Sequence, residues 1–129
     1  MPLLRTVSRK MEPDPYIPLI GALAGVGLIC QRNLSDQLIV SADQGPVLRN
    51  RGNSFLLSHR EGLWYLSTWS PVHYRVPAKQ DVVQLCSACI AVGASAINRV
   101  PGEIVMRFGL QEIDDRQYEE LFPTEGEGD

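Results

Sequence analysis

Two short β-forming segments separated by Glu61 and Gly62 constrain this chain more than any other feature. The segments NSFLLSHR (53–60) and LWYLSTW (63–69) are rich in aliphatic and aromatic residues. Glycine takes the positive φ that a two-residue hairpin turn needs. The two residues that flank such a turn are paired, and this fixes the register of every other pair in the hairpin. Directly paired residues share a face of the sheet. The turn therefore decides which aromatic side chains enter the core.

The register set by this turn gives the hairpin one apolar face and one mixed face. The apolar face carries Phe55, Leu57, Trp64 and Leu66, with His59 near its end, and the mixed face carries Leu56, Ser58, Tyr65, Ser67 and Trp69. The next predicted strand, 72–77, alternates apolar and polar residues, so its apolar members should join the core. His73 and Arg75 should then lie on the mixed face. We expect Trp64 to be structural.

The mixed face supplies the candidate binding residues, which are Tyr65, Trp69, His73 and Arg75. Aromatic residues and arginine are enriched among the side chains that carry most of the binding energy at protein interfaces. Two alternatives stay open at this point. A C-terminal helix packed over the mixed face would turn it into a second core layer. A slip of the register by one residue would exchange the two faces.

The remaining segments favour an α+β fold. The sequence predicts a further strand over 37–42 and helices over 16–26, 81–92, 101–109 and 114–122. Short connections between the strands force antiparallel pairing. We expect an antiparallel meander of three to four strands, with an N-terminal helix and two to three C-terminal helices packed on one face.

The run from Tyr16 to Cys30 contains no charged residue. Its fifteen residues are fewer than the roughly twenty that a bilayer-spanning helix needs, and no signal-peptide cleavage site follows it. We interpret the run as a buried helix that continues into a strand. Gly21, Gly25 and Gly27 lower its helix propensity. Their expected use is close approach of the helix to the sheet, because glycine has no Cβ.

A chain of 129 residues has the size of one domain. We expect an irregular arm at 1–13 and a disordered acidic tail at 123–129. The net charge is −3, and residues 103–129 hold nine acidic and two basic side chains. No overall positive field therefore recruits nucleic acid or an anionic membrane. The odd number of cysteines, three, argues against a secreted disulfide framework and favours reduced thiols in a cytoplasm.

Sequence signals for catalysis, cofactors and metals are weak. Cys86 and Cys89 form a C-x-x-C pair, but both lie on the apolar stripe of a predicted helix, which favours a core role over a redox or zinc site. His59 and His73 are the only imidazoles, and no nucleophile motif accompanies them. We therefore expect no catalytic residue, no metal ligand and no cofactor. The alternative is a small ligand- or metal-dependent enzyme that uses His59, His73 and the cysteines.

The order helix, β-meander, helices, together with the tryptophan-rich segment GLWYLSTWSPVHYRVP (62–77), resembles small bacterial immunity proteins and effector chaperones. The resemblance is one of architecture over residues 16–122 and includes no diagnostic motif, so no functional residue is carried over. It implies a protein that binds one protein partner and performs no chemistry. We expect a cytoplasmic protein-binding domain, monomeric or homodimeric, that acts as an immunity-type inhibitor or an effector chaperone. A structural subunit of a larger assembly is the further alternative.

Overall fold

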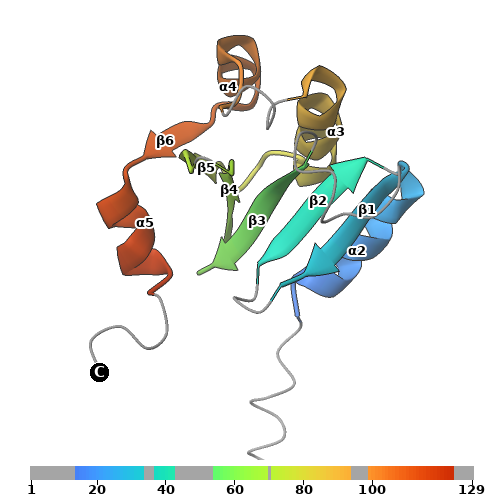
Figure 1. The fold of residues 1–129 in the computed structure, drawn as a ribbon, viewed down its shortest axis with the longest axis horizontal. Coiled ribbons are helices and arrows are strands. Elements are labelled where there is room, and N and C mark those ends of the chain that lie inside the picture. Colours follow the sequence, from blue (N-terminus) through green and yellow to red (C-terminus); the bar gives the residue numbers. More distant parts are fainter. Residues whose placement is uncertain (1–13, 34–36, 43–53, 70, 94–98, 124–129) are drawn as a thin grey trace, which may run out of the picture.

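The structure of the chain, a computed structural model, describes residues 14–33, 37–42, 54–69, 71–93 and 99–123. Within these ranges the chain forms a six-stranded antiparallel sheet and four helices (Figure 1). Across the sheet the strands follow chain order: β1 (Leu28–Arg32), β2 (Leu38–Ala42), β3 (Ser54–Arg60), β4 (Leu63–Ser67), β5 (His73–Val76) and β6 (Gln111–Ile113). The helices are α2 (Tyr16–Gly25), α3 (Val82–Val92), α4 (Gly102–Phe108) and α5 (Asp115–Leu121). The α+β class is confirmed, whereas the predicted count of three to four strands is too low.

The turn between β3 and β4 has the geometry expected from its sequence. Glu61 and Gly62 have φ values of 53° and 82°. Two successive residues with positive φ are typical of the type I′ turn, whose twist matches that of the flanking strands. Behind the turn the two strands pair in the predicted register, with Ser58 opposite Tyr65. Because successive residues alternate between faces, Trp64 points to the other side of the sheet.

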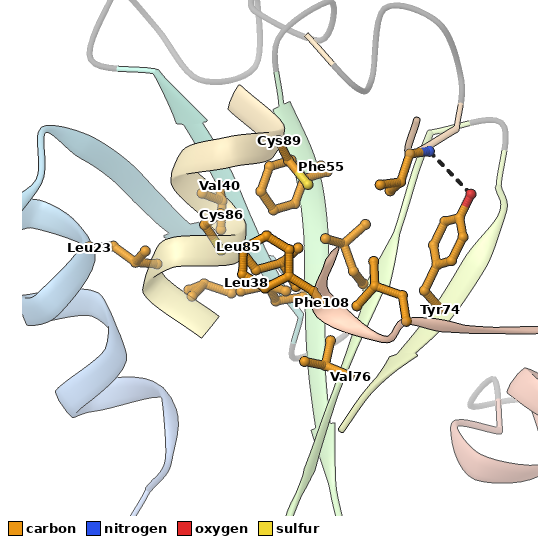
Figure 2. Close-up of a cluster of buried hydrophobic side chains, with 14 of the residues drawn as sticks. Leu23, Leu38, Val40, Phe55, Tyr74, Val76, Leu85, Cys86, Cys89 and Phe108 are labelled. Carbon is orange, nitrogen blue, oxygen red and sulfur yellow. Dashed lines mark hydrogen bonds between the residues drawn. The ribbon is translucent and has the colours of Figure 1, made fainter. Parts of the chain in front are cut away.

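One face of the sheet, here called the first face, packs against α2, α3 and α4 to form the main core (Figure 2). The buried members include Leu28, Leu38, Val40, Phe55, Leu57, Leu66, Tyr74 and Val76 from the sheet, Leu19 and Leu23 from α2, Leu85, Cys86 and Cys89 from α3, and Ile104 and Phe108 from α4. The indole of Trp64 packs against this cluster, edge-on to the ring of Tyr16 with 5.3 Å between the ring centroids. Trp64 therefore contributes to the core, as predicted.

Local sequence signals set the ends of α3, and a hydrogen bond to the sheet fastens the chain that follows it. The Asp81 carboxylate accepts hydrogen bonds from two backbone N–H groups of the first turn, and Gly93 ends the helix with a φ of 67°. Beyond α3, the backbone N–H of Val100 donates a hydrogen bond of 3.1 Å to the buried hydroxyl of Tyr74 on β5 (Figure 2). This bond satisfies a buried backbone donor and ties the segment before α4 to the sheet.

The helices do not all pack on one face, contrary to the prediction. α5 covers the opposite face, here called the second face, where Tyr118 forms a separate buried cluster with Tyr65 and Ile113. The second face carries aromatic and aliphatic side chains of its own, and these need a covering layer. β6 makes this possible, because it pairs with β5, places Ile113 opposite His73, and is followed directly by α5.

β6 was not predicted from the sequence, and it is only three residues long. β1 begins near the end of the uncharged run, where the sequence suggested that a helix continues into a strand. The arm predicted at 1–13 and residues 124–129 of the predicted tail lie outside the described residues.

Candidate functional site

The four predicted binding residues lie together on the second face. Tyr65 of β4 pairs with Arg75 of β5, and His73 lies two residues before Arg75 on the same face. Trp69 follows β4, and its indole N–H donates a hydrogen bond of 2.8 Å to the hydroxyl of Ser54 on β3. The alternation read from the sequence therefore agrees with the structure for Tyr65, His73 and Arg75, and the bond to Ser54 places the Trp69 indole on the same face.

α5 divides this group into covered and accessible members. Tyr65 is 3% exposed and His73 is 7% exposed, whereas Trp69 and Arg75 are half-buried. The ring of Phe122, at the end of α5, meets the ring of Tyr65 edge-on at 5.4 Å. At Tyr65 and His73 the second face is thus a second core layer, which was the alternative left open by the sequence. The role of the four residues in binding stays a prediction.

His73 lies between three groups that hold it in one orientation. Its Nδ1 is 2.6 Å from the hydroxyl of Ser67 on the neighbouring strand. Its ring stacks on the ring of Tyr118 with 3.7 Å between centroids and 6° between planes. Its Nε2 is 3.5 Å from a carboxylate oxygen of Asp115, in the first turn of α5. Burial lowers the pKa of the imidazole, and the nearby Asp115 charge opposes this effect in part.

Tyr118 also connects α5 to β3 and to Gln37, the residue that precedes β2. Its hydroxyl lies 2.9 Å from the hydroxyl of Ser58 on β3 and accepts a hydrogen bond of 2.8 Å from the side-chain amide of Gln37. Gln37 is itself fixed by Asn33, whose side-chain amide donates to the Gln37 side-chain oxygen. The apolar ring and the polar hydroxyl of Tyr118 are both satisfied, as buried tyrosines require.

Arg75 uses only part of its hydrogen-bonding capacity among the described residues. One of its terminal nitrogens donates to the side chain of Gln111 at 3.3 Å, and its guanidinium lies 5.9 Å from the ring centre of Tyr65. Its Nε is buried and has no hydrogen-bond partner within the part of the chain that the structure describes. A buried donor without a partner is costly, so this Nε destabilises the arrangement as it stands.

Ser67, His73 and Asp115 have the residue types of a hydrolytic triad. A nucleophilic serine must be reachable by a substrate, but Ser67 is 1% exposed and lies beneath α5. Tyr118 also covers one face of the imidazole. As arranged, these residues fasten α5 to the sheet, and a substrate has no route to Ser67.

The residues of the alternative enzyme lie on different sides of the sheet. His59 pairs with Trp64, and its ring lies 4.6 Å from the Trp64 indole on the first face, whereas His73 is on the second. Cys86 and Cys89 are fully buried on α3. Burial raises the pKa of the Cys86 thiol well above 9 and that of Cys89 to about 12, so both stay protonated and unreactive. The two imidazoles therefore lie on opposite faces of the sheet.

A second candidate surface lies on α2, on the side turned away from the sheet. The exposed residues of this side, here called the α2 solvent face, are Ile17, Pro18, Gly21, Ala22, Ala24, Gly25 and, just after the helix, Val26. None carries a charge or a polar side chain. Ile17 is 64% exposed and Val26 is 49% exposed. Surface helices usually turn charged and polar residues to water, so this face has the composition of a surface that another molecule covers.

The glycines of α2 correct one prediction. Gly21 and Gly25 do not approach the sheet, because both are exposed and no atom lies within 4 Å of the position that a Cβ would occupy. They lie four residues apart and so share one side of the helix with Ile17. The uncharged run is therefore buried on one side only, with Leu19 and Leu23 in the core.

Comparisons with known proteins assign no family. A scan against protein-family models finds no match, and searches of the curated proteins and of the solved structures find none. Among the described residues, no three His, Cys, Asp or Glu side chains gather closely enough to hold a metal ion. None of the helices in these ranges is long and apolar enough to cross a membrane. Function must be inferred from the chain's own surfaces.

Sequence reasoning missed the partners of His73 and the exposure of α2. Tyr118 and Asp115 both lie within the helix predicted over 114–122, so the element itself was predicted. What the sequence did not reveal is β6, which brings that helix next to His73. For α2, the absence of any charged residue was visible, but it was interpreted as complete burial.

Proposed function

We propose that this chain is a non-enzymatic protein-binding domain and that its partner docks on the α2 solvent face. The observation that supports this most strongly is the exposed side of a ten-residue helix that carries no charged or polar side chain. Contact between water and such a surface is unfavourable. Burying the exposed part of Ile17 alone would contribute about 1–2 kcal/mol to the free energy of binding. A protein partner with an apolar segment would gain this free energy.

The shape of the α2 solvent face favours a helix or an extended segment as the contacting element. Gly21 and Gly25 leave a shallow strip without side chains, with open space above it. Another backbone can approach closely where no Cβ intervenes. Ile17 and Val26 lie at the two ends of this strip and would supply the apolar anchors. We therefore expect the partner to contribute small and aliphatic residues to the contact.

Two narrower forms of the proposal are an immunity-type inhibitor and an effector chaperone. The architecture of one helix, a meander and later helices supports both, because it resembles small bacterial immunity proteins and effector chaperones. The chain also offers an acidic C-terminal part, with Glu112, Asp114, Asp115, Glu119 and Glu120 all exposed. Such a surface would speed association with a basic partner.

The sheet patch formed by Trp69 and Arg75 is the second candidate surface. Arg75 favours it through the buried Nε that lacks a partner among the described residues. With α5 in place, however, Tyr65 and His73 contribute nothing to this surface, so its accessible area is small. An enzyme finds less support, because His59, His73 and the cysteines lie apart.

The test is affinity capture with three baits: the unaltered chain, Ile17→Glu and Met106→Glu. Met106 is 83% exposed on α4 and gives a matched control for placing a carboxylate on an exposed apolar residue. We expect a partner that the unaltered chain and Met106→Glu retain and that Ile17→Glu binds at least about tenfold more weakly in titration calorimetry. All three baits should unfold at the same temperature. A partner held equally by Ile17→Glu would show that the α2 solvent face is not the binding surface.

A further inference from the structure

α5 owes its helical structure to its contact with the second face. It has seven residues, and isolated helices of this length are not stable in water. A capping box at Asp114 and Gln117 helps to start it. Tyr118 attaches it to the sheet by packing against Tyr65 and Ile113, and Leu121 and Phe122 pack against the same cluster. Since α5 is the last element that the structure describes, its release would leave the order of the strands unchanged (Figure 1).

His73 is the titratable group on the sheet that two side chains of α5 contact. Two groups of α5 face it: the Tyr118 ring stacks on the imidazole, and Asp115 approaches Nε2. Ser67 faces it from β4, and Ile113 lies opposite it on β6. On its own strand, Arg75 shares the second face two residues away. Asp115 is thus the one anionic group among these neighbours.

The neutral imidazole suits this position better than the charged one. The His73 side chain is 9% exposed, so protonation would place a charge where little water can solvate it. Its possible counter-ion is Asp115, whose side chain is 77% exposed. Attraction to a carboxylate in water is screened and weak. Stacking on Tyr118 favours the cation slightly. The lost solvation of the imidazole is the largest of these effects.

We propose that His73 is a proton-operated latch: protonation of its imidazole releases α5 from the second face, and the main core on the first face stays folded. The released state presents Tyr65 and His73 to solvent beside Trp69 and Arg75. The four residues then form one continuous patch, which α5 covers while His73 is neutral. The latch does not depend on whether a partner uses the α2 solvent face.

The direction of the pH dependence follows from linkage. Burial holds the pKa of His73 in the folded state below the ordinary value of 6.5. The docked state of α5 therefore binds fewer protons than the released state. The stability of docking is complete above about pH 6.5 and decreases as the pH falls below it. Each unit by which the two pKa values differ can change the docking equilibrium by about tenfold.

The experiment is hydrogen–deuterium exchange on the full chain at about pH 7.5 and about pH 5.5, with rates corrected for intrinsic exchange. We expect the amides of 115–122 to exchange roughly tenfold faster at the lower pH, while those of β3 and β4 keep their protection. His73→Gln, which cannot titrate, should abolish the difference. Asp115→Asn removes the attraction that partly offsets the lost solvation of the charged imidazole, so the acceleration of exchange at about pH 5.5 should be larger.

His59→Gln is the matched control, because burial also lowers the pKa of His59 but its ring lies on the first face. It should leave the response of α5 unchanged. Three results would overturn the latch: exchange in α5 that does not change with pH, a response that survives in His73→Gln, or a response abolished by His59→Gln. If His73→Gln does not fold, an acceleration in Asp115→Asn no larger than that of the unaltered chain overturns the latch instead.

Discussion

Substitutions at the two positions of the hairpin turn should change the free energy of unfolding in opposite directions: Gly62→Ala should lower it and Glu61→Asn should raise it. Gly62 has a φ of 82°, and nothing lies within 4 Å of the position of a Cβ, so Gly62→Ala causes backbone strain and no clash. An L-residue in this region costs about 1–2 kcal/mol. Glu61 already has a φ of 53° and is exposed. Asparagine tolerates this conformation better than glutamate, so Glu61→Asn should stabilise the chain by about 0.5–1 kcal/mol.

Urea unfolding measures both effects. With a slope of about 2 kcal/mol per molar, Gly62→Ala should lower the midpoint by about 0.5–1 M, and Glu61→Asn should raise it by roughly half as much. Gly102→Ala is the control, because Gly102 also has open space around it but lies in a helix without positive φ. It should be neutral or slightly stabilising. If Gly62→Ala is as harmless as Gly102→Ala, the type I′ turn and the register derived from it are wrong.

Two further predictions concern the main core. Tyr74→Phe leaves the buried N–H of Val100 without its acceptor and should destabilise the chain by about 1–3 kcal/mol in urea unfolding. Tyr65→Phe is the control, because the Tyr65 hydroxyl has no hydrogen bond among the described residues. It should destabilise the chain by less than about 0.5 kcal/mol. Equal losses would mean that the Tyr74–Val100 bond contributes nothing. Cys86 and Cys89 should not react with a thiol reagent at about pH 8 until urea unfolds the chain. Burial keeps both thiols protonated and inaccessible. Rapid labelling of the native chain would contradict their role in the core.

Local rules were sufficient for the hairpin and for α3. The Glu61–Gly62 turn and the period-two alternation predicted the pairing of Ser58 with Tyr65, and Asp81 and Gly93 marked the ends of α3 where the structure has them. These features depend on residues close together in the sequence. For the same reason the relative placement of the three candidate binding residues that lie in strands could be read from the alternation alone.

Features that depend on distant segments could not be predicted. β6 has three residues, Gln111–Ile113, too few to show a period, and it forms because β5 offers it a free edge. The helix over 114–122 was predicted, but which face of the sheet it covers depends on where β6 ends. The exposure of Gly21 and Gly25 likewise depends on how α2 is rotated against β1, and a helix without any charged residue gives no hydrophobic period from which to read that rotation.

Hydroxyl-radical footprinting of the chain with and without its captured partner tests the proposed binding surface most directly. It reports the solvent accessibility of Ile17 on α2, Met106 on α4 and Trp69 on the second face in one experiment. We predict that the partner protects the peptide containing Ile17 and leaves the oxidation of Met106 and Trp69 unchanged. Protection of Trp69 with unchanged oxidation at Ile17 would contradict the account and move the binding surface to the sheet.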